Sequence, residues 1–320
     1  MGFRIMGTGS AVPANAVSND DIAKFVDTSD EWITQRTGIK NRYISTGETL
    51  NVLAKEASEK AMEMAGVSAD SIDLIIVGTL SSDRIYPSAA CELQAAIGAK
   101  NAIAFDINAA CSGFLFALQI ANGYFATGGA KRALLVGAEI LSKMTDWTDR
   151  STCVLFGDGA GACIVDYDKD AVVTFSSGSD GTKGDALSCK NRPINNPYVK
   201  AEEELDHTHM DGQEVFKFAV KTVPHAIEDA MAKAGVTAED VDIFLLHQAN
   251  LRIIESVAKR LKRPIDLFPM IMSEFGNMSA ACVPILLDTQ VRRGNLKRGM
   301  QTVMAGFGAG LTWSAAVFVF

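Results

Sequence analysis

The strongest constraint on the fold of this chain is an internal repeat. The segment AGVSADSIDLIIVGT at 65–79 matches AGVTAEDVDIFLLHQ at 234–248 almost position by position. We call the separation between positions 65 and 234 the repeat distance. The shared glycines of GTGS (7–10) and SSGS (176–179) stand at the same separation. Self-similarity at a fixed distance is the signature of a repeated structural unit. The chain is therefore predicted to contain two copies of one unit.

A third pair of motifs occurs late in each half. GDGAGACIV at 157–165 resembles GFGAGLTWSAAV at 306–317, but these segments begin closer together than the repeat distance. The first half is thus expected to carry about 20 additional residues between its second and third landmarks. The charged connection DYDKDA (166–171) divides the chain into predicted units 1–168 and 169–320. Because this connection is too short for a flexible linker, we expect the units to pack as one body.

Each unit reads as strands alternating with helices. The runs DLIIVG and DIFLLH are apolar throughout and predict buried strands. A further helix and a glycine-punctuated hairpin of strands close each unit. This pattern indicates an α/β fold whose sheets are covered on both faces. In the first unit, a helix is predicted by apolar residues at helical spacing: Leu50, Leu53, Ala57, Ala61 and Met64.

The stretch 179–215 departs from this pattern. It is polar, with Gly, Pro and Asn scattered through it. A loop of this length in a compact domain is usually a functional cover or a mobile segment, although a plain surface excursion stays open.

Composition excludes several classes of protein. A net charge of −8 argues against nonspecific binding of nucleic acid. No apolar run approaches the length that crosses a bilayer, and the N-terminus lacks a basic start followed by an apolar core, so we expect a cytoplasmic protein. The six cysteines form no CxxC pair, and all except Cys111 are expected to be buried free thiols. No metal site is predicted, because His207 and His209 lie in a polar loop without a nearby cysteine.

Cys111 stands where the strand-like AIAFDI (102–107) turns into a helix of small and apolar residues. Its distance along the chain from Asp73 is close to the distance of Asn277 from the matching Asp242. We therefore expect Cys111 and Asn277 to occupy comparable helix starts. His247 directly follows the second-half strand. In a structure with two similar halves, such strand ends and helix starts are expected to converge where the halves face each other.

The three residue types suit nucleophilic chemistry. A thiolate is a nucleophile, and the N-terminus of a helix is expected to lower the pKa of the Cys111 thiol. A histidine can donate a hydrogen bond or move a proton, and an asparagine amide donates without titrating. Cysteine proteases use the same residue types, but their signatures QACRG and CGSCW are absent. The small residues around Cys111 favour a narrow channel for a long, thin substrate.

With these motifs the chain resembles the β-ketoacyl-acyl carrier protein synthase III family, condensing enzymes of the thiolase superfamily. The resemblance covers the whole chain, and "HQAN" with "AACSGF" is its most specific pair. Its motifs appear in order: TSDEWITQRTGI (28–39), AACSGF (109–114), GDGAGA (157–162), HQANLRI (247–253), FGNMSAA (275–281) and GFGAG (306–310).

The resemblance implies a thiolase-like duplicated αβαβα five-layer sandwich and an acyltransferase. The implied reaction is a decarboxylative Claisen condensation of a short acyl-CoA, with acetyl-CoA the expected starter, and malonyl-acyl carrier protein. This reaction initiates type II fatty acid synthesis. The resemblance also implies a homodimer that uses acyl-CoA as a substrate and holds no permanent cofactor.

The resemblance also assigns roles to residues. Cys111 would accept the acyl group, while His247 and Asn277 would hydrogen-bond the malonyl thioester carbonyl. The backbone N–H groups of Cys111 and Gly308 would form an oxyanion hole. Three further sets follow: a CoA site at Thr28, Trp32, Arg36, Arg150 and Asn250, an acyl pocket with Tyr86 and Phe307, and a carrier-protein docking surface at Lys217, Arg252, Lys259 and Arg260.

Structural alternatives stay open for these residues. A strand-end histidine is often structural, Asn277 could cap a helix, and Trp32 could belong to the core. The basic residues of 251–264 could be a solvated helix face. Two positions depart from the best-known members: Tyr86 replaces a Phe and Met278 replaces a small or β-branched residue. Both are expected to reshape the primer pocket.

Rival functions come from inside and outside the superfamily. The nearest is a condensing enzyme of secondary metabolism with another starter or acceptor. A thiolase needs a second catalytic cysteine, and Cys282 does not lie in a recognisable thiolase motif. Hydroxymethylglutaryl-CoA synthases need a catalytic Glu that the sequence does not reveal. A noncatalytic acyl-binding protein and a cysteine hydrolase are the remaining alternatives.

Overall fold

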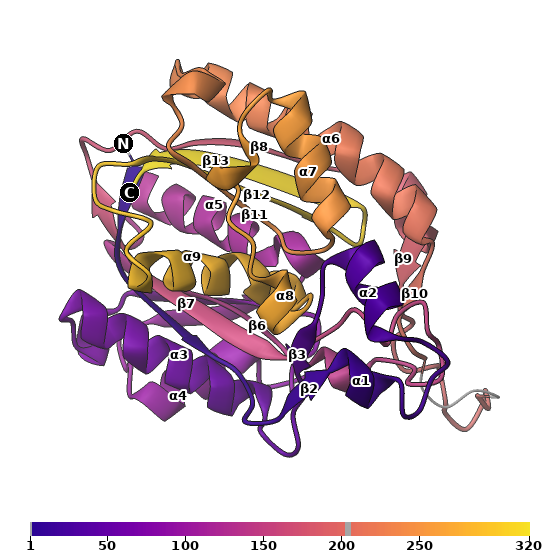
Figure 1. Ribbon diagram of the computed structural model, residues 1–320. Coiled ribbons are helices and arrows are strands. Elements are labelled where there is room, and N and C mark those ends of the chain that lie inside the picture. The colour runs from indigo at the N-terminus through magenta and orange to yellow at the C-terminus, as the bar shows by residue number, and fades with distance from the viewer. Residues whose placement is uncertain (1, 202–205) are drawn as a thin grey trace.

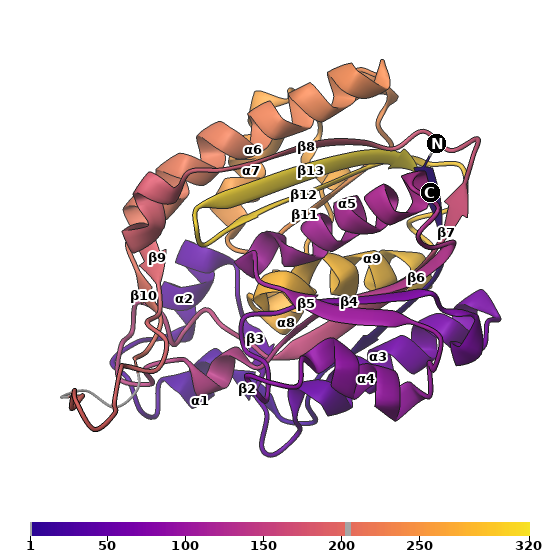
Figure 2. The ribbon, with the colours of Figure 1, turned by 180° about the vertical axis from the view of Figure 1, so that it is seen from behind.

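Five alternating layers of helices and sheets make up the computed structural model, which describes residues 2–201 and 206–320 (Figure 1). Two central helices lie between the sheets, and pairs of outer helices cover the sheets' other faces (Figures 1 and 2). The αβαβα sandwich implied by the resemblance is confirmed. From one outer layer to the other, the helices are α3 (Leu50–Ala65) and α4 (Ala89–Ile97), α5 (Gly113–Ala126) and α9 (Cys282–Arg292), and α6 (Gly212–Ala234) and α7 (Leu251–Arg260).

Each half of the chain supplies one sheet, and the two sheets share a strand order. The first runs β1-β7-β6-β4-β5 and the second runs β8-β13-β12-β11. In each, the first two neighbouring pairs are antiparallel and the third is parallel. The first sheet consists of β1 (Gly2–Ala11), β4 (Leu74–Gly78), β5 (Ile103–Ile107), β6 (Arg132–Glu139) and β7 (Gly159–Asp168). The second consists of β8 (Thr174–Ser179), β11 (Ile243–Leu246), β12 (Gln301–Gly308) and β13 (Thr312–Val319).

The strand register preserves the repeat distance found in the sequence. Leu74 pairs with Ala133, and Ile243 pairs with Thr302; each residue of the second pair follows its counterpart by one repeat distance. The predicted duplication is therefore confirmed. The chain passes from the first sheet to the second after Asp168, where β7 ends; the division into units at that residue stays a prediction about domains.

The third pair of sequence motifs does not correspond in the structure. GFGAG begins inside β12, where Gly306 lies one repeat distance after Gly137 of β6, whereas GDGAGA (157–162) leads into β7. That alignment was wrong. The two motifs look alike because both are rich in glycine for close packing, and they do not occupy equivalent positions in the two halves. The longer connection in the first half is confirmed: residues 140–158 join β6 to β7, whereas only 309–311 join β12 to β13.

Most of the smaller elements lie together at one side of the sandwich (Figures 1 and 2). The strands β2 and β3 pair with each other, as do β9 and β10, which give structure to part of the predicted loop 179–215. These elements are α1 (Asn19–Ile22), α2 (Asp30–Thr37), α8 (Met272–Phe275), β2 (Ala16–Ser18), β3 (Asn41–Tyr43), β9 (Leu187–Ser188) and β10 (His209–Met210).

Glycines allow helices to lie directly against the first sheet. A Cβ added to Gly9 of β1 would stand 2.2 Å from the carbonyl oxygen of Ala57 in α3. One added to Gly161 of β7 would stand 2.6 Å from the nitrogen of Ile285 in α9. The motifs GTGS and GDGAG therefore serve close packing of backbone against backbone.

The cysteines are less uniformly buried than the sequence predicts. Cys153, Cys163 and Cys282 are buried, but Cys91 is exposed and Cys189 is half-buried, so the prediction was wrong for these two. Cys91 lies on the solvent face of α4, whose other face holds the buried residues. Within the described residues, no helix has both the length and the apolar character needed to span a bilayer.

Replacing Gly137 of β6 by Ala is expected to lower the free energy of unfolding by about 1–3 kcal/mol, measured by urea denaturation. Its Cβ would stand 2.1 Å from the carbonyl oxygen of Ala280, so backbone must shift. The matched control is Gly123→Ala on α5, where a Cβ meets nothing within 4 Å. That change should be neutral or stabilising, because alanine favours a helix by about 0.5–1 kcal/mol. Equal stability of the two variants would contradict the packing argument.

Candidate active site

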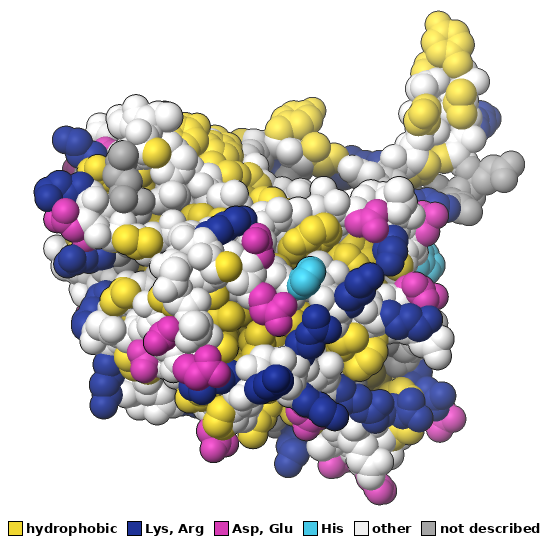
Figure 3. Space-filling view, turned by 90° about the horizontal axis from the view of Figure 1, so that it is seen from above, with side chains coloured by type: hydrophobic (Ala, Val, Ile, Leu, Met, Phe, Trp, Pro, Cys, Tyr) yellow, Lys and Arg dark blue, Asp and Glu magenta, His cyan; other side chains and the backbone are white. Residues whose placement is uncertain are grey.

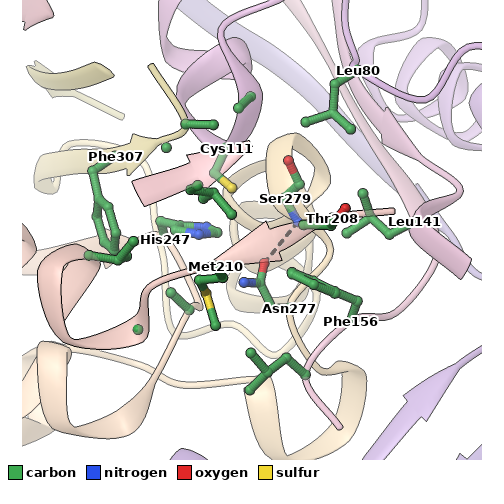
Figure 4. A pocket seen from close by; sticks show the side chains of 18 of the residues that line it. Leu80, Cys111, Leu141, Phe156, Thr208, Met210, His247, Asn277, Ser279 and Phe307 are labelled. Carbon is green, nitrogen blue, oxygen red and sulfur yellow. Dashed lines mark hydrogen bonds between the residues drawn. The ribbon is translucent and has the colours of Figure 1, made fainter. Parts of the chain in front are cut away.

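A cavity of about 180 Å³ lies between the two halves, and Cys111, His247 and Asn277 line it (Figure 4). Cys111 belongs to the 3₁₀ turn η2 (Ala110–Ser112) that leads into α5. His247 directly follows β11, and Asn277 lies two residues before the turn η7 (Ser279–Ala281), which leads into α9. The predicted convergence of these three residues is therefore confirmed.

The two halves carry the same sharp turn, which we call the elbow, at residues 108–112 and 277–281. Ala110 has a φ of 45°, and Ser279, which follows it by one repeat distance, has a φ of 47°. In each elbow an asparagine side chain closes the turn. The Oδ1 atom of Asn108 accepts a hydrogen bond from the N–H of Ala110 at 3.3 Å, and Oδ1 of Asn277 accepts one from the N–H of Ser279 at 2.9 Å.

This correspondence corrects one sequence prediction. Asn277 matches Asn108, and Cys111 matches Ala280, so Cys111 and Asn277 do not occupy comparable positions. Counting along the chain from the preceding strands was not accurate enough to align the two turns. The segments NAACS and NMSAA have little identity, and the backbone dihedral angles are what align them.

The side-chain amide of Asn277 is held in one orientation. Its Oδ1 atom accepts hydrogen bonds from the N–H of Ser279 and, at 3.6 Å, from the thiol of Cys282. Its backbone N–H donates to the carbonyl of Leu155 at 2.9 Å, and its carbonyl accepts from the N–H of Gly157 at 3.0 Å. With the side-chain oxygen engaged, the NH₂ group is the part left to donate toward a substrate. No pattern in the sequence pointed to this role of Cys282.

His247 is buried and neutral. Only 3% of it is exposed, and burial lowers its pKa to about 3. Its ring meets that of Phe307 edge-on, with 5.5 Å between the centroids. Its Nδ1 atom has no hydrogen-bonding partner among the described residues. A neutral imidazole offers one N–H donor, so this residue can hydrogen-bond a carbonyl oxygen without carrying charge.

Cys111 is a thiol rather than a thiolate in this resting structure. Burial raises its pKa to about 12, and the nearby Ser279 hydroxyl opposes this rise only partly. Removal from water is the largest influence on this pKa. The expected lowering by the helix N-terminus stays a prediction.

The backbone of Gly308 comes directly against that of Cys111. A Cβ on Gly308 would stand 2.6 Å from the backbone nitrogen of Cys111. The peptide groups of η2 and β12 are thereby brought together at the cavity wall, which both residues line. Phe307 also lines the cavity and is 4% exposed.

Most of the remaining wall is apolar and was not identified from the sequence. The segment 179–215 contributes to it, as expected of a cover. Met278 does not line the cavity; it is fully buried in the core, so the expectation that it reshapes the pocket was wrong. Tyr86 is 84% exposed and lies outside its own chain's cavity. The apolar wall includes Leu80, Leu141, Met144, Leu155, Phe156, Leu187, Met210, Val215 and Ile253.

Two arginines pack against the ring of Trp32 on α2. The guanidinium carbons of Arg36 and Arg150 lie 4.7 Å and 4.9 Å from the centre of its ring. Arg150 also donates a hydrogen bond to the carbonyl of Asp27 at 2.9 Å. Next to Asp27 in the chain, the buried Oγ1 atom of Thr28 has no hydrogen-bonding partner among the described residues. These four predicted residues therefore form one group.

Asn250 joins this group to the cavity, which it lines. Its Oδ1 atom caps α7 by accepting from the N–H of Arg252 at 2.9 Å. Its Nδ2 atom donates to the carbonyl of Arg36 at 3.0 Å. Both ends of the amide are thus engaged in holding α7 against α2.

The predicted basic residues lie on α6 and α7, the outer helices of the second sheet. Lys217 pairs with Glu214 at 2.8 Å, and Arg252 donates to the carbonyl of Gln35 at 3.4 Å. Lys259 and Arg260 stand in the last turn of α7. Viewed onto these helices, Lys and Arg side chains are numerous at the lower right of the surface and also line its left edge, with Asp and Glu among them (Figure 3).

Comparison with known proteins identifies the family. The model of 3-oxoacyl-[acyl-carrier-protein] synthase III matches residues 105–181, and the model of its C-terminal part matches 231–320. A β-ketoacyl-[acyl-carrier-protein] synthase III of Clostridium acetobutylicum is 48% identical over 316 residues, covering 98% of this chain and 97% of that protein.

Solved structures agree with this result. The crystal structure of a 3-oxoacyl-[acyl-carrier-protein] synthase III from Aquifex aeolicus superposes with a TM-score of 0.93 at 41% identity, covering both chains completely. The priming β-ketosynthase of the R1128 polyketide pathway superposes with a TM-score of 0.93 at 37% identity, covering 99% of this chain and 96% of that one. The chain therefore belongs to the β-ketoacyl-acyl carrier protein synthase III family of acyl-transferring condensing enzymes.

Proposed function

We propose that this enzyme condenses a short acyl-CoA, acetyl-CoA in the first instance, with malonyl-acyl carrier protein and so initiates type II fatty acid synthesis. The observation that carries the proposal is the meeting of Cys111, His247 and Asn277 on one narrow, apolar cavity. No step requires a bound metal or a permanent cofactor.

In the first half-reaction Cys111 attacks the thioester carbonyl of acyl-CoA. The C–S bond to CoA breaks, a C–S bond to Cys111 forms, and the thiol proton leaves with CoA. The backbone N–H groups of Cys111 and Gly308 stabilise the charge that develops on the carbonyl oxygen. Their peptide groups are in contact, which supports this pairing.

In the second half-reaction malonyl-acyl carrier protein loses CO₂, and the resulting enolate attacks the acyl group on Cys111. His247 and the NH₂ group of Asn277 donate hydrogen bonds to the malonyl thioester carbonyl and stabilise the enolate. Both donors are uncharged, and both lie in a site from which water is largely excluded, where such hydrogen bonds are strongest.

The CoA moiety enters past the group of Thr28, Trp32, Arg36, Arg150 and Asn250. The indole of Trp32 stacks on adenine, and the two guanidinium groups bind phosphates. Asn250 contacts the pantetheine arm where the group meets the cavity. The presence of both guanidinium groups beside Trp32 supports this assignment.

The acidic carrier protein docks on the basic residues Lys217, Arg252, Lys259 and Arg260. Positive charge on an otherwise acidic protein steers an acidic partner to one face. The position of α7 supports this, because its first turn borders the cavity through Asn250 and Ile253. The enzyme works in the cytoplasm, a proposal supported by six free cysteines, several of them buried.

A second candidate is a priming condensing enzyme of secondary metabolism. The similarity to the priming β-ketosynthase of the R1128 polyketide pathway favours it. The two functions share the chemistry at Cys111 and differ in the starter and in the acceptor, so the preferred acyl-CoA separates them.

Incubation with a panel of acyl-CoAs is expected to add one acyl group to the enzyme, detected by intact-protein mass. Cys111→Ala should show no adduct, whereas Cys163→Ala, which alters a buried thiol of β7 outside the cavity, should react normally. Malonyl-acyl carrier protein should discharge the adduct, and water alone should not. An adduct that persists in Cys111→Ala, or hydrolysis without the malonyl partner, would argue against the proposal.

Trp32→Ala is expected to raise the KM for acyl-CoA about tenfold while leaving kcat nearly unchanged, since stacking on a base contributes about 1–3 kcal/mol to binding. Steady-state kinetics measure this. Trp313→Phe serves as the control, because Trp313 packs on Phe218 away from the cavity. A fall in kcat without a rise in KM would show that Trp32 has another role.

We expect a homodimer, with the loop around Tyr86 reaching the acyl pocket of the partner. Support comes from the exposure of Tyr86 and Ile85 and from the half-exposed Ile103 on the edge strand β5. Light scattering should give twice the mass of one chain at micromolar protein. Tyr86→Ala should change which acyl-CoA chain lengths are accepted. A monomeric mass would contradict this expectation.

A further inference from the structure

The proposed condensation leaves Cys111 in need of a proton. When the enolate attacks, a C–C bond forms and the C–S bond of the acyl-enzyme breaks, so Cys111 departs as a thiolate. A buried thiolate is costly, and the thiol is strongly preferred at this position. Free CO₂ carries no proton away or back. One proton must therefore reach the sulfur of Cys111 in every cycle.

A buried carboxyl lies behind the second elbow. The turn η7 (Ser279–Ala281) packs between η2, which holds Cys111, and the end of β6, where Glu139 is the last residue. Glu139 is completely buried and Ser279 is 2% exposed. In the close-up, Ser279 lies beside Cys111 on the wall of the cavity (Figure 4).

One oxygen of Glu139 is fully engaged and the other is not. Its Oε2 atom accepts hydrogen bonds from the hydroxyls of Thr79 and Ser81 and from the N–H of Leu80. Its Oε1 atom and the Oγ atom of Ser279 are both buried and lack a hydrogen bond in the described structure. Two orphaned polar atoms in the same packed region call for an explanation, because each is costly to leave unpaired.

The Ser279 hydroxyl lies within electrostatic reach of both groups. Burial raises the pKa of Glu139 to about 7, and the polar groups of Ser81, Leu80, Ser279 and Thr79 oppose the rise. The Ser279 hydroxyl also moderates the raised pKa of Cys111. Among the described residues, the charge of Glu139 acts on two titratable groups, the thiols of Cys111 and Cys282. Lys143, on the turn that follows β6, forms an ion pair with Asp83 and donates a hydrogen bond to the carbonyl of Ser82.

The repeat shows that this carboxyl belongs to one half only. Glu139 ends β6, and its counterpart one repeat distance later is Gly308, which ends β12 beside the backbone of Cys111. The strand of the first half thus ends in a carboxyl behind the second elbow, whereas the strand of the second half ends in a glycine that lies close to the first elbow.

We propose that Glu139, acting through the hydroxyl of Ser279, returns a proton to Cys111 after condensation; this inference rests on the proposed function. The Glu139 carboxyl gives its proton to Oγ of Ser279 as the Ser279 hydroxyl gives its own to the sulfur of Cys111. Glu139 is left as a carboxylate and regains a proton from water before the next cycle. Glu139 does not contact the sulfur itself, and its proton reaches the sulfur only through Ser279.

The test isolates the second half-reaction. Enzyme acylated beforehand on Cys111 is mixed with malonyl-acyl carrier protein across pH 5.5–8.5, and both product and the ultraviolet absorbance of a thiolate are followed. In the wild type, reprotonation should slow as pH rises through about 7, because the protonated form of Glu139 is lost. Glu139→Gln keeps a hydrogen-bonding group of the same size but cannot titrate. In this variant the inflection in the pH profile should disappear, the reprotonation of Cys111 should be about 100-fold slower, and thiolate should accumulate.

Ser279→Ala removes only one hydroxyl and should behave like Glu139→Gln, with the double variant no slower than either single one. It also keeps the inference testable should Glu139→Gln fail to fold. The matched control is Asp288→Asn, which alters a buried carboxyl bonded to Thr8 at 2.8 Å and Ser10 at 2.6 Å, outside the cavity. Its pH profile should equal that of the wild type.

Two failures can be told apart. If wild-type enzyme takes no acyl group on Cys111, the proposed function fails. If acylation and condensation proceed, but Glu139→Gln or Ser279→Ala retains the wild-type inflection near pH 7, the relay is overturned and the proposed function stands.

Discussion

The contact on which the site depends is backbone against backbone, where the two elbows meet the central strands. Gly137 of β6 lies against the carbonyl of Ala280, and Gly308 of β12 lies against the nitrogen of Cys111. A single Cβ at either glycine would push the layers apart. Because Cys111 and the amide of Asn277 come from different halves, their separation is set by these contacts rather than by either half alone.

Burial then decides the charge of every group on the cavity. The thiol of Cys111 stays protonated, His247 stays neutral, and the Asn277 amide cannot ionise. In the proposed mechanism the site therefore stabilises negative charge with neutral hydrogen-bond donors, which suits an enolate and a tetrahedral oxyanion alike. Burial also raises the pKa of the Glu139 carboxyl to about 7, and in the proposed relay this carboxyl exchanges the proton.

Duplication gave the protein two copies of one elbow that now do different work. Both turns are closed by an asparagine, at 108 and at 277, yet only the second presents its amide to the cavity, while only the first carries the cysteine. The backbone provides two equivalent turns, and in the proposed mechanism the side chains on them serve as nucleophile in one half and as hydrogen-bond donor in the other.

The sequence by itself determined the duplication, the alternation of strands and helices, and the meeting of Cys111, His247 and Asn277, because a repeat and a buried strand leave patterns along the chain. It could not place the elbows, since these are defined by dihedral angles at Ala110 and Ser279 that no residue type there announces. It also could not show that Met278 is buried in the core, that Cys282 holds Asn277, or that Glu139 and Ser279 lie behind Cys111. Those facts, and the shifted pKa values that follow from them, depend on which surfaces are removed from water when two distant segments pack, and only the tertiary structure decides that.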